Sequence, residues 1–152
     1  MATAHLLYGY IGAGKTTLAM QLERELPAVR FTPDSWMVRL FGHDPPEADF
    51  RSRTQAVIEL LEPLWTQCLA CGADVVLDYG FWRRCERDRA RRLAAQAGAD
   101  VRLHVLACED AEAARRIEMR NADPASSLFI APATYRALKA RLEPAGDDEL
   151  GC

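Results

Sequence analysis

The stretch Gly9-Tyr10-Ile11-Gly12-Ala13-Gly14-Lys15-Thr16 decides the fold of this chain, because it matches the phosphate-binding loop Gly-x-x-x-x-Gly-Lys-Ser/Thr. An apolar run, Leu6 to Tyr8, precedes it, and a helical run, Thr17 to Leu26, follows. Glycines let successive backbone N–H groups turn toward an anion at the helix N-terminus. The ammonium of Lys15 then reaches the β- and γ-phosphates, and the Thr16 hydroxyl binds Mg²⁺. The motif predicts a nucleoside triphosphate site formed by residues 9–17.

Length and charge restrict the class of protein. At 152 residues, the chain is expected to form one domain. The net charge of −3 and the isoelectric point near 5.6 give no overall attraction to nucleic acid or to an anionic membrane. No apolar stretch reaches the length of a membrane span, and the N-terminus lacks the pattern of a signal peptide. We therefore expect a cytoplasmic protein with no membrane partner.

The sequence contains five cysteines, an odd number that favours free thiols in a reducing compartment. Cys68 and Cys71 have Cys-x-x-Cys spacing, but neither a second pair nor a suitably placed histidine accompanies them. We expect thiols at the end of a helix rather than a metal or redox site.

Apolar runs alternate with helical segments along the chain. Four runs suit strands buried on both faces of a parallel sheet: His5–Tyr8, Val29–Thr32, Val75–Leu77 and Val101–Leu106. Four helices are expected: Lys15–Leu26, Arg51–Ala70, Arg83–Ala97 and Asp110–Arg120, the second and third stopped by Gly72 and Gly98. This order predicts an α/β fold of the P-loop NTPase type, in three layers, with a mainly parallel sheet of four or five strands.

Two further expectations concern packing. The apolar face of the second long helix is assigned to Ala56, Leu60, Leu61, Leu64 and Cys68, and Pro63 could kink that helix. The acidic stretch after Pro144 is expected to be a loose tail, about residues 144–152, with nothing to bury.

Two aspartates follow predicted strands and are candidates for chemistry. Asp78 closes the third strand, where a carboxylate near Mg²⁺ is expected. Asp34 follows the second strand and could take a proton from an acceptor hydroxyl. Asp34-Ser35 could equally cap a short helix running to Leu40, and position alone does not choose between the two. Both aspartates should lie beyond the carboxyl ends of the strands, where ligands bind in open α/β sheets.

Aromatic and basic residues suggest the surroundings of this edge. A substrate pocket is assigned to Trp36, Met37, Tyr79, Phe81 and Trp82, together with Arg87. Most arginines between Arg83 and Arg92 are interpreted as a solvated helix, although one or two could hold a substrate anion. Arg115, Arg116 and Arg120 follow the fourth strand, and at least one of them could close over a transferring phosphoryl group.

With these residues in place, the sequence resembles the small bacterial P-loop kinases of the AAA-33 and zeta-toxin type, which are similar to chloramphenicol phosphotransferase and to the kinase domain of polynucleotide kinases. The resemblance covers nearly the whole chain and rests on Leu6–Thr17, Thr32–Met37, Val75–Trp82 with Glu86-Arg87-Asp88, and Ala114–Asn121. It implies transfer of the γ-phosphate of ATP to a hydroxyl, with Mg²⁺. It also implies that Lys15 and Asp34 act in catalysis, with Asp34 as base, and that Arg116 and Arg120 belong to a helical lid. Residues 122–127 depart from the family pattern, because they contain no arginine.

Three functions are compatible with these features. The first is a kinase for a small hydroxylated molecule such as a nucleoside, a sugar or an antibiotic. The second is a 5′-hydroxyl polynucleotide kinase, which requires a positive groove leading to Asp34 and salt-dependent binding. The third is a nucleotide-dependent switch or ATPase without an acceptor. The identity of the acceptor, the oligomeric state and the choice between ATP and GTP do not follow from the sequence.

Overall fold

Four parallel strands form the centre of this computed structural model, which describes residues 1–9, 14–106, 110–122, 136, 140 and 142–149. The strands are β1 (Thr3–Tyr8), β2 (Ala28–Phe31), β3 (Asp74–Gly80) and β4 (Asp100–Val105), in the order β2-β3-β1-β4. Leu6 pairs with Leu77 of β3 and with Leu103 of β4. The parallel α/β sheet predicted from the alternating pattern is confirmed.

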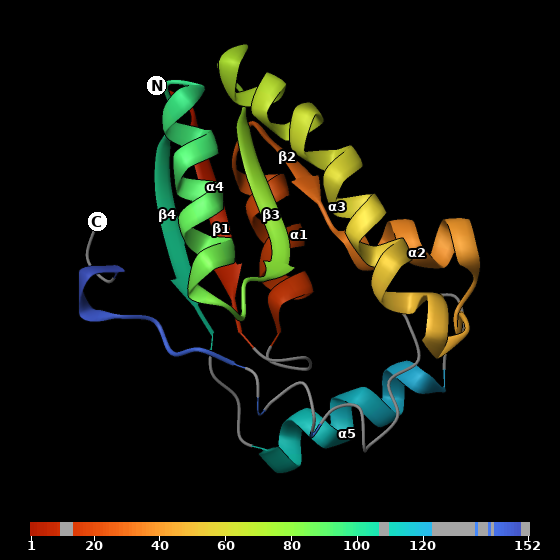
Figure 1. Ribbon diagram of the computed structural model, residues 1–152. Helices are drawn as coiled ribbons and strands as arrows, with labels where there is room; N and C mark the ends of the chain where they lie inside the picture. The colour runs from red at the N-terminus through yellow and green to blue at the C-terminus, as the bar shows by residue number, and fades with distance from the viewer. Residues whose placement is uncertain (10–13, 107–109, 123–135, 137–139, 141, 150–152) are drawn as a thin grey trace.

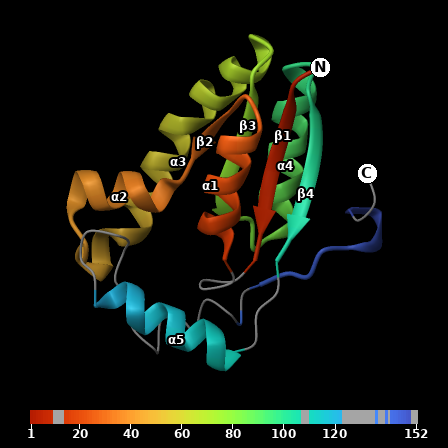
Figure 2. The ribbon, with the colours of Figure 1, turned by 180° about the vertical axis from the view of Figure 1, so that it is seen from behind.

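Helices cover both faces of the sheet. They are α1 (Lys15–Glu25), α2 (Pro33–Phe41), α3 (Glu47–Ala70), α4 (Arg84–Gln96) and α5 (Asp110–Asn121), followed by the 3₁₀ turn η1 (Asp147–Glu149). Figures 1 and 2 show α1 on one face and α3 and α4 on the opposite face, which gives three layers. In both views α5 lies beyond the carboxyl ends of the strands. Helix α5 therefore lies next to the sheet edge that was expected to bind ligands.

The hydrophobic core lies mainly between the sheet and the α3–α4 layer. Leu6 and Leu77 are fully buried there and pack with Trp65 of α3 and Ala94 of α4. A smaller cluster, Leu7, Val76 and Ala19, lies under α1. The central strands β1 and β3 are buried on both faces, which explains their continuous apolar runs.

The apolar face predicted for α3 was wrong by about one position. The buried residues are Val57, Leu61, Trp65 and Leu69, whereas Leu60 and Leu64 are 53% and 42% exposed. Leucines at neighbouring positions offer two overlapping stripes, and only packing against the sheet selects the one that contains Trp65. The helix continues through Pro63 and ends at Ala70, and Gly72 follows with a φ of +87° that suits glycine.

The expectation of a loose tail with nothing to bury was wrong for the described part of that tail, residues 144–149. Glu149 is only 6% exposed, because its carboxylate accepts hydrogen bonds from Arg87 at 2.7 and 3.2 Å and from Arg91 at 2.6 Å. Acidic composition predicted solvation, but a buried guanidinium can draw an acidic segment onto the domain. Residues 150–152 lie outside the described part of the chain.

Three further observations concern the cysteines, metal binding and membranes. Cys68, Cys71 and Cys85 are free thiols. Within the described ranges, no group of three or more His, Cys, Asp or Glu side chains is arranged to hold a metal ion. None of the helices that the structure describes is long and apolar enough to cross a bilayer.

Candidate active site

The phosphate-binding loop joins β1 to the N-terminus of α1. Gly14 precedes the helix with a φ of +94°, a left-handed conformation that an L-residue with a side chain adopts only under strain. Its carbonyl accepts the N–H of Leu18 at 3.1 Å, and the N–H of Gly9 donates to Gly80 of β3 at 3.2 Å. The helix begins at Lys15, and Thr16 and Thr17 form its first turn. The predicted phosphate-binding residues Tyr10, Ile11, Gly12 and Ala13 lie outside the described residues.

Thr16 and Asp78 form one polar pair at the carboxyl edge of the sheet. The Thr16 hydroxyl donates to Oδ2 of Asp78 at 2.8 Å, and the Thr32 hydroxyl donates to the same oxygen at 3.1 Å. Asp78 is 7% exposed and lies within β3, which extends to Gly80, two residues beyond the predicted strand end. A hydroxyl beside a carboxylate supplies hard oxygen donors of the kind that Mg²⁺ prefers. The pair predicted from sequence as a metal site is thus adjacent in space.

Asp34 lies in the first turn of α2. Pro33 opens that helix, and Thr32, not Asp34, is its N-cap residue. The alternative in which Asp34-Ser35 caps this helix was therefore wrong for Asp34. The carboxylate of Asp34 instead lines a pocket together with Lys15, Thr16 and Asp78.

Charges around Asp34 and Lys15 are close enough to shift both pKa values. The Asp34 side chain is exposed at the pocket surface, but desolvation by the surrounding protein raises its pKa. The positive charge of Lys15 opposes this shift, the charge of Asp78 adds to it, and Arg120 opposes it. Desolvation likewise lowers the pKa of Lys15, against the attraction of Asp78 and Asp34. A carboxyl group with a raised pKa suits general-base chemistry better than an ordinary aspartate does.

Helix α5 brings arginines toward this site. Ala113 and Ile117 are buried, and Arg120, one turn beyond Ile117, lines the pocket. Arg116 donates to Glu112 at 3.1 Å, and its Nη1 lies 3.6 Å from the position that a Cβ on Gly14 would occupy. The two predicted lid arginines are thus near the loop. Arg115 is exposed and paired with Glu112.

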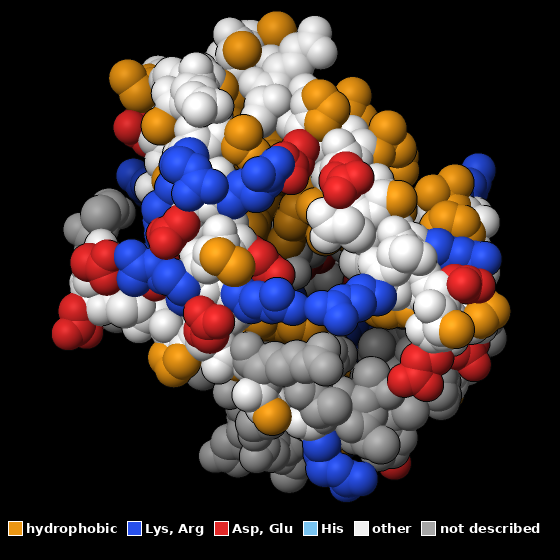
Figure 3. Space-filling model, viewed as in Figure 1, with side chains coloured by type: hydrophobic (Ala, Val, Ile, Leu, Met, Phe, Trp, Pro, Cys, Tyr) orange, Lys and Arg blue, Asp and Glu red, His pale blue; other side chains and the backbone are white. Residues whose placement is uncertain are grey.

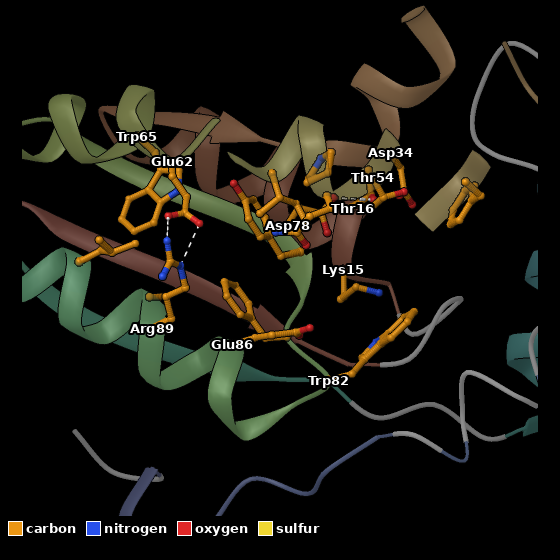
Figure 4. Close-up of a pocket in the computed structure, with 18 of the residues that line it drawn as sticks. Lys15, Thr16, Asp34, Thr54, Glu62, Trp65, Asp78, Trp82, Glu86 and Arg89 are labelled. Atoms are coloured by element: carbon orange, nitrogen blue, oxygen red, sulfur yellow. Dashed lines mark hydrogen bonds and ion pairs between the residues drawn. The ribbon is translucent and has the colours of Figure 1, made fainter. Parts of the chain in front are cut away.

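A cavity of about 320 Å³ extends from Lys15 across the carboxyl edge of the sheet to α3 and α4. Figure 3 shows the hollow, with hydrophobic side chains inside it and both basic and acidic side chains at its rim. Figure 4 shows Lys15, Thr16 and Asp34 on one side, Asp78 between, and the Glu62–Arg89 pair on the other side. We call these the phosphate end and the acceptor end of the pocket. Its lining is Lys15, Thr16, Pro33, Asp34, Phe50, Thr54, Gln55, Ile58, Glu62, Trp65, Asp78, Tyr79, Phe81, Trp82, Glu86, Arg89, Ala90, Leu93, Ile117, Arg120 and Asn121.

Half of the predicted pocket residues lie elsewhere. Tyr79, Phe81 and Trp82 line the cavity, and the first two rings stack with centroids 5.3 Å apart. Met37 is fully buried in the core, and Trp36 is 38% exposed outside the pocket lining. Both lie on α2, whose first turn alone reaches the cavity, so nearness to Asp34 in sequence was misleading.

Arg87 is not a substrate contact either, which corrects the prediction. Its side chain is fully buried and is held by Glu149 and by the carbonyls of Phe81 at 2.7 Å, Glu143 at 3.1 Å and Pro144 at 3.2 Å. Its guanidinium also lies 4.9 Å from the centre of the Tyr8 ring. Arg87 thus joins the C-terminal segment to the turn between β3 and α4, a role that helix spacing alone did not reveal.

The segment between β3 and α4, which Arg87 holds, also contacts the start of the phosphate-binding loop. Phe81 has a φ of +51°, which is uncommon for a residue with a side chain. The carbonyl of Trp82 accepts the N–H of Glu143 at 2.6 Å, while its indole N–H donates to the carbonyl of Gly9 at 2.8 Å. Trp82 therefore links three parts of the structure: the C-terminal segment, the pocket wall and the start of the loop.

The acceptor end contains residues that the sequence interpretation missed. Most come from α3, where Phe50, Thr54, Ile58, Glu62 and Trp65 recur every three or four residues along one stripe of the helix. That spacing was visible in the sequence, but the mixture of polar and apolar types concealed it. The remainder, Glu86, Arg89, Ala90 and Leu93, come from α4.

Comparisons with known proteins agree with this architecture. The AAA_33 family model, described as an AAA domain, matches residues 5–145. The search of curated proteins found no match. Among solved structures, a chain of the Pnkp1/Rnl/Hen1 RNA repair complex is similar, with a TM-score of 0.75 and 20% identity over 93% of this chain. This chain spans only 44% of that one.

Two other structures are similar over almost the whole chain. A candidate kinase from Chloroflexus aurantiacus j-10-fl has a TM-score of 0.74 at 19% identity, covering 99% of this chain and 84% of its own. A sugar kinase from Janibacter sp. HTCC2649 has a TM-score of 0.67 at 17% identity, covering 98% and 82%. At such identities, the likeness establishes the fold. With its phosphate-binding loop and its family match over residues 5–145, the chain belongs to the AAA_33 family and has the fold of the small P-loop kinases.

Proposed function

We propose that this protein is a kinase that transfers the γ-phosphate of ATP to a hydroxyl group of a small molecule. The observation that carries the proposal is that Asp34 shares one pocket with Lys15, Thr16 and Asp78. A carboxylate beside a pocket lined by aromatic side chains is what a phosphotransferase needs to position an acceptor and take its proton.

The phosphate end fits a nucleotide with its metal ion. Lys15 and the N-terminus of α1 would bind the β- and γ-phosphates, and the Thr16 and Asp78 oxygens would hold Mg²⁺. The ion, when bound, neutralises charge that develops on the phosphate oxygens. Arg120, which lines the pocket near Asp34 and Lys15, stabilises the same charge from the α5 side.

The place of Asp34 in the pocket and the direction of its pKa shift support a role as general base. Asp34 orients the acceptor hydroxyl and takes its proton as the new oxygen–phosphorus bond forms and the bond between the γ-phosphorus and the bridging oxygen of ADP breaks. Because its pKa is raised, Asp34 binds that proton more readily than an exposed aspartate does. The aromatic side chains of the acceptor end exclude water, which would otherwise compete as acceptor.

The test is a labelling experiment with purified protein, γ-labelled ATP and Mg²⁺. Pools of nucleosides, sugars, antibiotics and 5′-hydroxyl oligonucleotides are offered separately, and the products are separated from free phosphate. Label in one of the small-molecule pools supports the proposal. Label appearing only as free phosphate in every pool would contradict it and favour an ATPase.

A 5′-hydroxyl polynucleotide kinase is the second candidate, favoured by the similarity to a chain of an RNA repair complex. It predicts label in the oligonucleotide pool and a steep loss of binding with added salt. The charges at the acceptor end, considered next, favour the small molecule.

A further inference from the structure

The charged side chains at the acceptor end are more acidic than basic, whereas a site for an anion needs unpaired positive charge. Apart from Lys15, Asp34, Asp78 and Arg120, the described lining residues that carry charge are Glu62, Glu86 and Arg89. Two of these three are carboxylates. An anionic acceptor would thus meet net negative charge, in addition to Asp34, at the place where its own charge needs a partner.

The guanidinium of Arg89 is already neutralised. Its Nε donates to Oε1 of Glu62 at 3.0 Å and its Nη2 donates to Oε2 at 2.8 Å, a bidentate arrangement drawn in Figure 4. Both residues line the pocket, and the Glu62 side chain, 16% exposed, is more buried than that of Arg89, which is 58% exposed. A bound anion would have to share the Arg89 guanidinium with the carboxylate of Glu62, which already offsets its charge.

The other polar groups at this end are neutral. Thr54 Oγ1, Trp65 Nε1 and the Tyr79 hydroxyl are buried and have no hydrogen-bond partner within the described residues. A hydroxyl, an indole N–H and a phenol hydroxyl suit an uncharged ligand with hydrogen-bonding substituents.

The shape and the apolar walls of the cavity also favour an uncharged ligand. Phe50, Ile58, Trp65, Phe81 and Leu93 present apolar or aromatic surface to the cavity. The whole cavity, phosphate end included, has a volume of about 320 Å³, near the lower limit of about 300 Å³ for small-molecule sites. Flat, largely apolar molecules of modest size fit such walls better than extended polyols or polymers.

We propose that the acceptor is an uncharged alcohol with a flat, largely apolar body, and that the Glu62–Arg89 pair determines this specificity by excluding anionic acceptors. The inference rests on the proposed kinase function, because only a phosphotransferase has an acceptor. The binding preference of the pocket, however, does not depend on phosphate transfer. Binding and transfer are therefore measured separately.

The test uses two matched pairs of probes, each with a free primary hydroxyl. The first pair is 1,4-benzenedimethanol and 4-(hydroxymethyl)benzoate, and the second is uridine and uridine 3′-monophosphate. Binding to the full chain is followed by tryptophan fluorescence, since Trp65 and Trp82 line the pocket. We expect the neutral member of each pair to bind at least about tenfold more tightly, which corresponds to about 1.4 kcal/mol.

Two substitutions should move this preference in opposite directions. Glu62→Gln removes the partner of Arg89 and exposes a guanidinium, so the preference for neutral probes should fall to less than about threefold. Arg89→Ala leaves Glu62 without its cation, so the discrimination against anions should increase. Asp49→Asn is the matched control, because it removes one carboxylate from an exposed ion pair with Arg53 on the same helix, away from the pocket lining. It should leave the preference unchanged.

The outcomes separate the two proposals. Equal or tighter binding of the anionic probes by the natural protein overturns the inference, as does a preference that Glu62→Gln leaves unchanged in a variant with a native circular dichroism spectrum. Failure of both neutral probes to bind at millimolar concentration also contradicts it. If neutral probes bind selectively but never accept phosphate from ATP or GTP in any pool, the kinase function fails while the specificity of the pocket stands.

Discussion

The phosphate end and the acceptor end of the pocket are built in different ways. Lys15 and Thr16 are neighbours in sequence at one helix terminus, and the loop before them is a local motif. At the acceptor end, Phe50 and Trp65 of α3 meet Arg89 and Leu93 of α4 only through packing on the sheet. A local motif can be kept while the packed end changes. Kinases of one fold can therefore share a phosphate site and differ in acceptor.

The largest effect should come from Asp34, the carboxylate at the phosphate end. Asp34→Asn removes the proposed base while keeping its size, so transfer should fall by roughly 10²–10⁴-fold. Affinity for a non-hydrolysable ATP analogue should remain nearly unchanged. Steady-state transfer rates and equilibrium titrations measure the two quantities, with Asp100→Asn, an exposed residue at the start of β4, as control.

The pH dependence provides a check on the same residue. The base acts as a carboxylate, and its pKa is raised above the ordinary value of 3.8. The activity of the natural protein should therefore fall on the acid side at a higher pH than an unperturbed aspartate would cause, and Asp34→Asn should lose this limb. Full activity of Asp34→Asn would show that the hydroxyl loses its proton elsewhere.

Outside the pocket, the buried ion pair between Arg87 and Glu149 also depends on tertiary packing, and its loss should lower stability. Arg87→Ala leaves the carboxylate of Glu149 buried with fewer donors, and the free energy of unfolding should drop by about 3–5 kcal/mol. Denaturant titration measures the drop. Arg92→Ala, an exposed position on the same helix, should have little effect. A loss of under about 1 kcal/mol for Arg87→Ala would mean that the C-terminal segment does not stabilise the domain.

Acid should weaken the same contact. Burial alone would raise the pKa of Glu149, but hydrogen bonds from Arg87, from the Gly146 backbone and from Arg91 outweigh it and lower the pKa from 4.5 to about 2. Because the folded pKa is the lower one, this carboxylate stabilises the fold fully above pH 4.5 and loses that contribution as the pH falls toward about 2. In Glu149→Gln, the part of the acid dependence that comes from this group should disappear.

A smaller loss of transfer activity is expected when a cation of α5 is removed from the phosphate end. Arg120→Ala removes a cation that lies near Asp34 and Lys15, so transfer should fall by about 10²-fold. Arg116→Ala should have less effect, since Arg116 does not belong to the described pocket lining. Arg115→Ala is the control, because Arg115 is exposed and paired with Glu112. Equal rates for the Arg115 and Arg120 variants would contradict a role of Arg120 at the transferring phosphate.

The smallest effect concerns the link between the ends. Trp82→Phe keeps an aromatic wall but removes the N–H that donates to Gly9 at 2.8 Å, a loss of about 1 kcal/mol. The dissociation constant for ATP should rise about fivefold, as measured by calorimetry. Trp36→Phe, outside the pocket lining, should leave this constant unchanged. If Trp82→Phe altered acceptor binding alone, the two ends would be independent.

The sequence predicted the features that depend on local motifs and missed those that depend on packing between distant elements. The phosphate-binding loop was recognisable, as were the parallel sheet and the closeness of Asp78 to Thr16, because these features depend on short motifs and on strand order. Asp34 was identified only as one of two alternatives. The positions of Met37, Trp36 and Arg87 were predicted wrongly, since each lies on a helix whose rotation about its axis is set by packing.

The sequence by itself determined the phosphate-binding motif, because its glycines, Lys15 and Thr16 all fall within the stretch from Gly9 to Thr16. Only the tertiary structure decided which face of α3 lines the pocket, that Arg89 is neutralised by Glu62, and that Arg87 holds the C-terminal segment. These pairs are 27 and 62 residues apart in sequence. No local rule specifies them, since they form only when the sheet has placed α3, α4 and the final segment side by side.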